Sequence, residues 1–177
     1  QVNQAEAMAY AVRSFRRGFD ANHRTSGALV WQFDDCWPSV SWSMMSFCQE
    51  GEPPRRKPSF YAVRRELLPW AVGLATTASP HSIALWVCAP PLPADGLACT
   101  QATLLLRAFH PDGRPLLRDE RQVTVVSNQS LEVGTWDLPT DAGPLIVGAQ
   151  LCVNAEDGEQ VVARSVLWPQ PLHTLSN

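Results

Sequence analysis

Aromatic and acidic side chains gather in one short stretch of this sequence. Three of its seven tryptophans, Trp31, Trp37 and Trp42, lie within twelve residues, and Asp34 and Asp35 stand between the first two. A pyranose has an apolar C–H face that stacks on an indole, and edge hydroxyls that donate hydrogen bonds to carboxylates. The stretch therefore has the residue types needed to hold a sugar.

These residues also have a purely structural interpretation. Tryptophan is highly buried on average, and an aspartate after a strand often bonds to backbone amides in a turn. On composition alone, packing is the commoner role. Position decides: at the C-terminal end of a barrel strand, Trp31, Asp35 and Trp37 would lie on the face where (β/α) barrels carry their active sites.

The first seventy residues show the order helix, strand, loop and helix. Apolar residues recur every three or four positions from Val2 to Phe15, which predicts an amphipathic helix. Residues 27–33 are a nearly continuous apolar run, typical of a parallel strand covered on both faces. Residues 34–57 follow neither period, and so long a loop in a compact domain is usually functional or disordered. Pro58 then opens a second helix.

The remaining sequence is predicted to be all-β. Its strand-like stretches are separated by turn signals such as Pro111-Asp112-Gly113 and Glu156-Asp157-Gly158. The stretches cover residues 71–75, 82–88, 102–109, 122–126, 131–136, 145–153 and 160–168. Seven strands are the number that an immunoglobulin-like sandwich needs. We therefore predict two domains, residues 1–72 and 73–177.

Composition excludes several classes of protein. Residues 71–177 hold five basic side chains against ten acidic ones, and no basic cluster exceeds Arg55-Arg56-Lys57, so no nucleic-acid partner is expected. No apolar run approaches the ~20 residues that cross a bilayer, so no membrane partner is expected. The five cysteines lack metal-ligand spacing, and we expect neither a metal nor a cofactor. Asn128 is a candidate glycosylation acceptor, and the compartment stays open.

Residues 25–38 carry a specific resemblance. The run Trp31-Gln32-Phe33-Asp34-Asp35-Cys36-Trp37-Pro38, followed by Ser41-Trp42, resembles the eighth barrel strand and following loop of β-mannosidases of glycoside hydrolase family 2. Gln4-Ala5-Glu6 and the segment from Arg56 to Glu66 are similar to flanking motifs of that family. Asp34 departs from the family's usual Asn, and residues 49–55 are longer and more hydrophilic than its pattern.

The resemblance implies a fold and an activity. The fold would be α/β followed by all-β: the last helix-strand-helix of a (β/α)8 TIM barrel, then the sandwich. The activity would be hydrolysis of terminal non-reducing β-D-mannose from manno-oligosaccharides with retention, by two glutamates ~5–5.5 Å apart. We expect both glutamates upstream of Gln1, within the rest of the same enzyme, and assign no catalytic residue here.

The resemblance also implies a role for this chain in binding the terminal sugar. We expect Trp31, Asp35 and Trp37 to form part of the glycone subsite, joined by Gln32 and Asp34. Gln32 has the alternative of a bond within the barrel wall, and Asp34 that of satisfying turn amides.

Two other functions remain open. The first is a different family 2 activity, such as that of a β-galactosidase, β-glucuronidase or exo-β-glucosaminidase. The second is a non-catalytic immunoglobulin-like binding module with a helical stem.

Overall fold

The computed structural model describes residues 1–20, 22, 24–91 and 99–168. It divides the chain into two compact units, Gln1–Leu68 and Pro69–Asn177. The predicted domain boundary, between residues 72 and 73, falls within the first strand of the second unit. Among the described residues, no helix is long and apolar enough to span a membrane.

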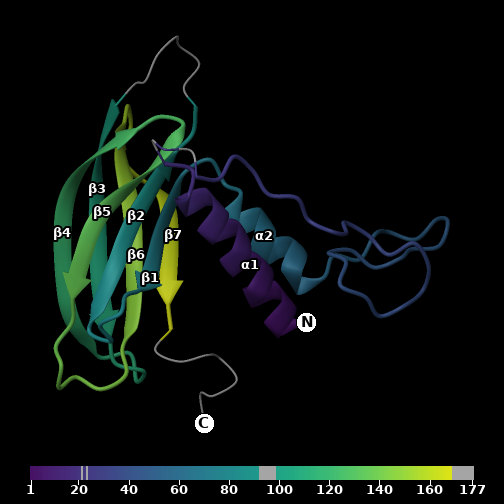
Figure 1. Ribbon diagram of the computed structural model, residues 1–177, viewed down its shortest axis with the longest axis horizontal. Coiled ribbons are helices and arrows are strands. Elements are labelled where there is room, and N and C mark those ends of the chain that lie inside the picture. Colours follow the sequence, from purple (N-terminus) through teal and green to yellow (C-terminus); the bar gives the residue numbers. More distant parts are fainter. Residues whose placement is uncertain (21, 23, 92–98, 169–177) are drawn as a thin grey trace. The chain divides into compact units, whose positions relative to one another are not determined.

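Two helices lie side by side in the first unit, α1 (Val2–Arg17) and α2 (Pro58–Glu66) (Figure 1). The stripe predicted on α1 buries Ala5, Ala9 and Val12. Val12 meets Met44 and Val63 in a small apolar cluster, against which Met8, Val30 and Phe60 also pack. Both predicted helices are confirmed, and their apolar faces hold part of the intervening segment between them.

Charged side chains add a second connection between the helices. Arg13 on α1 donates two hydrogen bonds to the Glu66 carboxylate, Nη2 to Oε1 at 2.6 Å and Nε to Oε2 at 3.1 Å. Hydrogen bonding to Glu66 raises the pKa of Arg13. Arg16 Nη1 donates to the carbonyl oxygens of Glu66 and Leu68, each at 2.6 Å. These carbonyls lie at the C-terminus of α2, where unpaired C=O groups favour a cation.

The predicted strand over residues 27–33 is wrong for this chain. These residues form no strand, and the nearest ladder contact is an isolated parallel bridge between Asp34 and Met45. A strand is stabilised by hydrogen bonds to neighbouring strands, and a barrel strand needs one on each side. The described part of this unit supplies no such pair, so the apolar run has no regular secondary structure.

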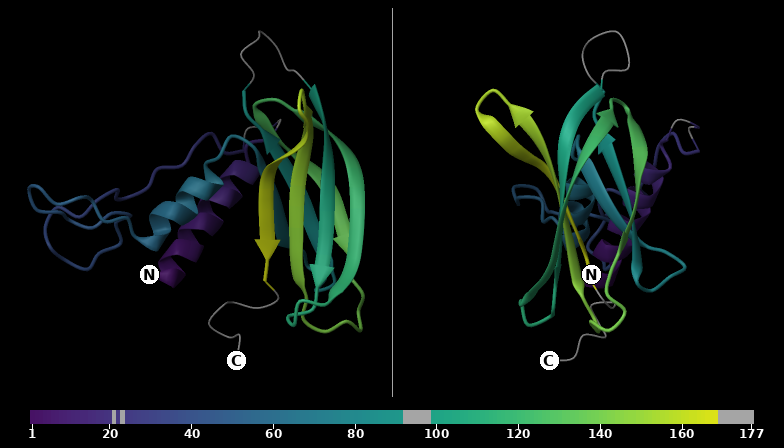
Figure 2. Two further views of the ribbon diagram at one scale, coloured as in Figure 1. Left: turned by 180° about the vertical axis from the view of Figure 1, so that it is seen from behind. Right: turned by 90° about the vertical axis from the view of Figure 1, so that its left-hand side faces the viewer.

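The described residues of the second unit form a sandwich of seven strands. Figures 1 and 2 show its two layers. They are β1 (Ala71–Thr76), β2 (Ser82–Ala89), β3 (Cys99–Phe109), β4 (Pro115–Val126), β5 (Gln129–Asp137), β6 (Ile146–Ala155) and β7 (Gly158–Leu167). One sheet has the order β1-β2-β5 and the other β4-β3-β6-β7, with every pair antiparallel. The predicted immunoglobulin-like sandwich is confirmed.

Alternation along the strands builds the core of the sandwich. In β3, Leu104 and Leu106 are fully buried while Leu105 between them faces outward. In β2, Leu85 and Val87 belong to the same core cluster, although Trp86 between them is buried as well. Among the described residues, seventeen buried residues form this one continuous cluster. The edge strand β4 is mostly exposed and carries charged side chains, which oppose pairing with another chain.

One glycine makes room for the largest buried side chain. Gly73 in β1 is paired with Trp86 in β2. A Cβ built on Gly73 would lie 1.9 Å from the indole of Trp86, which is 1% exposed. Any side chain at position 73 would therefore force the indole to move.

Candidate functional site

The segment between the two helices folds back on itself through backbone hydrogen bonds. The Met45 amide donates to the Phe33 carbonyl at 2.9 Å, and the Asp35 amide donates to the Met45 carbonyl at 3.1 Å. On the other side, the Lys57 amide donates to the Met44 carbonyl at 2.9 Å. Met44 and Met45 thus lie between the start and the end of the predicted loop, which brings Asp35 close to Lys57.

Asp35 and Lys57 form a buried ion pair. Lys57 Nζ donates to Asp35 Oδ2 at 3.0 Å, to Ser43 Oγ at 2.7 Å and to the Ser41 carbonyl at 3.2 Å. These three acceptors match the three protons of an ammonium group. The two charged side chains are only 1% and 6% exposed. Burial of the pair is tolerated because every ammonium proton has a partner.

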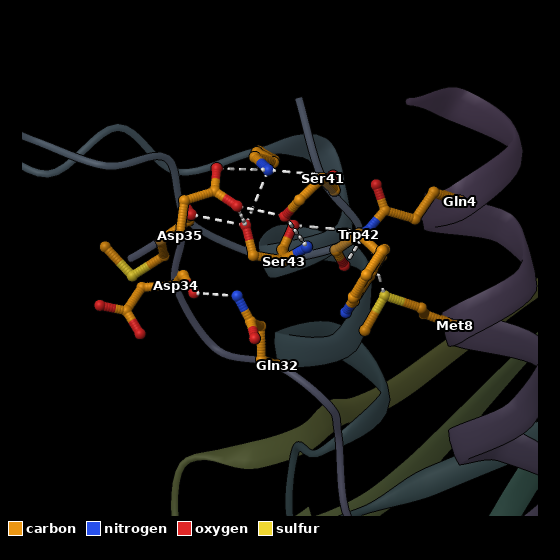
Figure 3. Close-up of polar contacts among 10 residues, drawn as sticks. Gln4, Met8, Gln32, Asp34, Asp35, Ser41, Trp42 and Ser43 are labelled. Carbon is orange, nitrogen blue, oxygen red and sulfur yellow. Dashed lines mark hydrogen bonds and ion pairs between the residues drawn. The ribbon is translucent and has the colours of Figure 1, made fainter. Parts of the chain in front are cut away.

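The other Asp35 oxygen accepts hydrogen bonds from two serines. Ser43 Oγ donates to Asp35 Oδ1 at 2.7 Å, and Ser41 Oγ donates to the same atom (Figure 3). The hydrogen bonds from Ser41 and Ser43, and after them the hydrogen bond and charge of Lys57, lower the pKa of Asp35 from 3.8 to about 2. Asp35 is therefore a fixed anion at neutral pH, with both oxygens occupied inside the protein.

Gln4 joins this network to α1. Its side-chain amide nitrogen donates to the carbonyl of Trp42, and lies 3.3 Å from the carbonyl of Ser43 (Figure 3). Gln32 makes a local contact instead, donating from Nε2 to the Asp34 carbonyl at 2.8 Å. The peptide bond between Trp31 and Gln32 is cis.

The three tryptophans of this segment are exposed to solvent. Trp31, Trp37 and Trp42 are 80%, 66% and 61% exposed, and Leu29 and Val40 beside them are fully exposed. Single exposed apolar residues are ordinary, but several together on one segment mark a surface that contacts something else. The segment therefore exposes its indoles to solvent, while Asp35 and Lys57 neutralise each other in a buried ion pair.

The predicted site residues are thus divided by the structure. Trp31, Trp37 and Asp34 are exposed, Gln32 is half-buried, and only Asp35 is buried. Sequence reasoning missed the residues that fix Asp35, namely Lys57, Ser41, Ser43 and, through the adjacent backbone, Gln4. A signal was present, because Ser41-Trp42-Ser43 alternates polar and aromatic residues and Lys57 directly precedes the first residue of α2.

A family model for the mannosidase Ig/CBM-like domain matches residues 94–173. These residues include strands β3 to β7 of the sandwich.

Named relatives match nearly the entire chain. Beta-mannosidase B of Aspergillus oryzae is 35% identical over 187 residues, covering 99% of this chain and 21% of that protein. Beta-mannosidase B of Aspergillus niger is 35% identical over 193 residues, with the same coverage. The chain spans about a fifth of the length of these relatives.

Solved structures share the fold. A β-D-mannosidase from Dictyoglomus thermophilum has a TM-score of 0.75 at 22% identity, over 97% of this chain and 19% of that one. An exo-chitosanase from Amycolatopsis orientalis has a TM-score of 0.66 at 15% identity, over 95% of this chain and 18% of that one. The resemblance predicted from the motifs around Trp31 is confirmed by these matches: over nearly its entire length the chain is similar to about one fifth of named β-mannosidases, and residues 94–173 match the mannosidase Ig/CBM-like domain.

Proposed function

We propose that this chain is part of a retaining exo-β-mannosidase that removes terminal non-reducing β-D-mannose from manno-oligosaccharides. In this proposal residues 1–72 complete a (β/α)8 barrel whose remaining strands, with both catalytic glutamates, belong to the rest of the enzyme. Trp31 and Trp37 form walls of the glycone subsite, with Gln32 and Asp34 at its edge. Asp35 positions the loop that carries them.

The observation that supports this role is a difference in exposure within one segment. The indoles of Trp31 and Trp37 are exposed, whereas the charged pair Asp35–Lys57 is buried. A sugar site requires aromatic faces in a fixed position, since a mobile side chain loses conformational freedom on binding. Asp35 follows Trp31 by four residues and precedes Trp37 by two. Its buried ion pair with Lys57 therefore anchors the segment that carries both indoles. When the neighbouring strands are present, residues 27–33 gain ladder hydrogen bonds in addition to those that the Gln32 and Phe33 carbonyls accept from the Met44 and Met45 amides.

Two carboxylates of the first unit, those of Asp35 and Glu66, do not suit the catalytic steps. A glycosidase acid must be protonated near neutral pH, which requires a raised pKa, whereas the pKa of Asp35 is lowered to about 2. A nucleophile needs a free oxygen, but both Glu66 oxygens accept hydrogen bonds from Arg13. These contacts support the assignment of catalysis to residues outside this chain.

Substrate preference tests the proposed activity. The full-length enzyme should hydrolyse nitrophenyl β-mannoside with a higher kcat/KM than the matching β-galactoside, β-glucuronide or β-glucosaminide. Dominant activity on any of the other three would replace the proposed specificity. Absence of hydrolysis of all four would favour a non-catalytic binding module.

Tryptophan variants of the full-length enzyme test the proposed subsite. Trp31→Ala and Trp37→Ala should each reduce kcat/KM on β-mannoside by at least about tenfold, which corresponds to ~1.4 kcal/mol of transition-state stabilisation. Trp168→Ala removes an exposed indole of the second unit and serves as the matched control. Equal effects of all three substitutions would show that the indoles of the first unit have no special role.

A further inference from the structure

A hollow lies on the outer face of the four-stranded sheet, away from the sandwich core. It has a volume of about 250 Å³ and is lined by residues of β3, β6 and β7, among them Leu105, Arg107, Gly148, Gln150 and Arg164. The register places Arg107 and Val166 on either side of Gly148, and Leu105 and Arg164 on either side of Gln150. The hollow is therefore centred on the middle strand of the three.

The fold does not explain the glycine at the centre of this hollow. Gly148 lies in the interior of β6, where glycine is less favourable than alanine because it loses more conformational freedom on folding. Its φ is not in the left-handed region, and an added Cβ would meet no atom within 4 Å. By contrast, Gly73 is required by the Trp86 indole. A strand glycine without a packing or conformational reason often marks the close approach of a ligand.

The charges around the hollow are unusual for this part of the chain. Residues 71–177 contain five basic side chains against ten acidic ones, yet Arg107, Arg118 and Arg164 all lie on this face. Arg118 is directly opposite Arg107 across the β3–β4 pair, an arrangement of like charges that destabilises a sheet. Arg118 has a salt bridge at 3.6 Å to Glu120, the acidic side chain beside it.

The two arginines of the hollow keep their binding capacity. Within the described residues, neither Arg107 nor Arg164 takes part in a salt bridge. Arg107 on β3 is opposite Gly148 of β6, and Arg164 on β7 is opposite Gln150, two residues further along β6, so the two backbones are about 12 Å apart. Each guanidinium can donate two parallel hydrogen bonds to a carboxylate.

We propose that this hollow binds a sugar residue that bears a carboxylate, that is, a hexuronic acid. Its carboxylate would accept hydrogen bonds from Arg107 and Arg164, its hydroxyls would contact Gln150, and its apolar ring face would lie over Gly148 beside Leu105 and Val166. Pockets for drug-sized ligands measure about 300–1,000 Å³, so a hollow of about 250 Å³ is of a size for a single sugar ring and no larger ligand. This site lies within the second unit and does not depend on the proposed β-mannosidase activity.

Titration of the ¹⁵N-labelled 177-residue chain with sodium glucuronate tests this proposal by NMR. Saturable amide shifts are expected at Gly148, Gln150 and Val166. Methyl glucoside, which has the ring without the charge, and acetate, which has the charge without the ring, should each bind about tenfold more weakly or not at all. Equal shifts with acetate and glucuronate would reduce the site to general attraction of anions and overturn the proposal, as would shifts confined to other residues.

Substitutions identify the atoms responsible. Arg107→Ala and Arg164→Ala should each weaken glucuronate binding by about tenfold, and Gly148→Leu should abolish it by filling the hollow. Arg114→Ala, at an arginine paired with Asp112 in the β3–β4 turn, is the matched control. Unchanged affinity in both hollow arginine variants would contradict the proposal even if Gly148→Leu failed to fold.

A protein occupant has a different signature. If glucuronate does not bind, and Arg107→Ala lowers the Tm of the full-length enzyme while Arg114→Ala does not, then the face docks an acidic segment of the remaining protein. That result would also overturn the proposed sugar site.

Discussion

The two units are stabilised by different kinds of interaction. The second unit has a continuous cluster of seventeen buried apolar residues, whereas the main cluster of the first has three, Val12, Met44 and Val63. The first unit compensates with charged and polar contacts, notably Asp35–Lys57 and Arg13–Glu66. Apolar burial is nondirectional and forgiving, while buried ion pairs depend on geometry and on pH. Apolar burial therefore builds the sandwich of the second unit, whereas buried ion pairs hold the segment between the helices of the first unit in a defined position.

The largest effect on stability is expected in the core of the second unit. Leu104 is completely buried there, and Leu104→Ala should lower the free energy of unfolding by about 2–5 kcal/mol, because it removes apolar contacts and leaves a cavity. Chemical denaturation of the 177-residue chain measures the loss. Leu116→Ala, at an exposed leucine of β4, should cost far less; similar losses would mean that the core is not specifically packed.

Removal of the buried lysine should produce the next largest effect. Lys57→Met leaves the Asp35 carboxylate without its cation, so the pKa of Asp35 should rise above its present value of about 2 and the chain should lose stability. Carboxyl NMR titration and thermal unfolding measure the two quantities. Replacement of both partners, Asp35→Leu with Lys57→Met, should restore part of the stability. A double variant less stable than Lys57→Met would contradict this expectation. It would show that hydrogen bonds of the pair to neighbouring groups stabilise the fold in addition to the neutralisation of one charge by the other.

Acid should affect the first unit through Asp35. The pKa of this carboxyl is lower in the folded chain, about 2 against 3.8, so its charge stabilises the fold above pH 3.8. That contribution should decrease as the pH falls from about 4 to 2. Asp35→Asn should remove this dependence, which is measured by denaturation at several pH values. A wild-type chain and an Asp35→Asn variant with parallel pH profiles would contradict the assignment.

The smallest of these effects on stability are expected at arginines that are wholly or partly exposed to water. Arg13→Ala should lower the free energy of unfolding by about 1 kcal/mol, because it removes a bidentate salt bridge to Glu66 that is only partly shielded from water. Arg118→Ala removes the exposed bond to Glu120 and should change stability by less than about 0.5 kcal/mol. Salt screens ion pairs, so the difference in unfolding free energy between the two variants should be smaller at high salt than at low salt. Denaturation at both salt concentrations measures this change.

The same contrast explains what the sequence could predict. Alternation within β3 and β6 is local, and the seven predicted strands of the sandwich are all present. The strand over residues 27–33 failed because a parallel strand depends on neighbours that its own sequence does not encode. The resemblance to family 2 β-mannosidases was recognisable from the run after Trp31, because that motif is long.

Within the candidate site, residue types were easier to predict than contacts. Composition and motif predicted Trp31, Trp37 and Asp35 as site residues. They did not predict that Asp35 is buried. Its partner Lys57 lies 22 residues away and is brought near by Met44 and Met45. Periodicity carries no information about such a pairing. The proposed roles of Trp31, Gln32, Asp34 and Trp37 remain predictions for the assays above.

The turn between β4 and β5 has a consequence for the timing of any glycan attachment. Asn128 is exposed, with a left-handed φ of 57°, but Ser130 of the same acceptor motif is buried in β5. A glycosyltransferase must reach both the amide and the hydroxyl of the motif. Modification of Asn128 would therefore have to occur on the nascent polypeptide, before β5 joins β2, and the completed sandwich would be a poor acceptor.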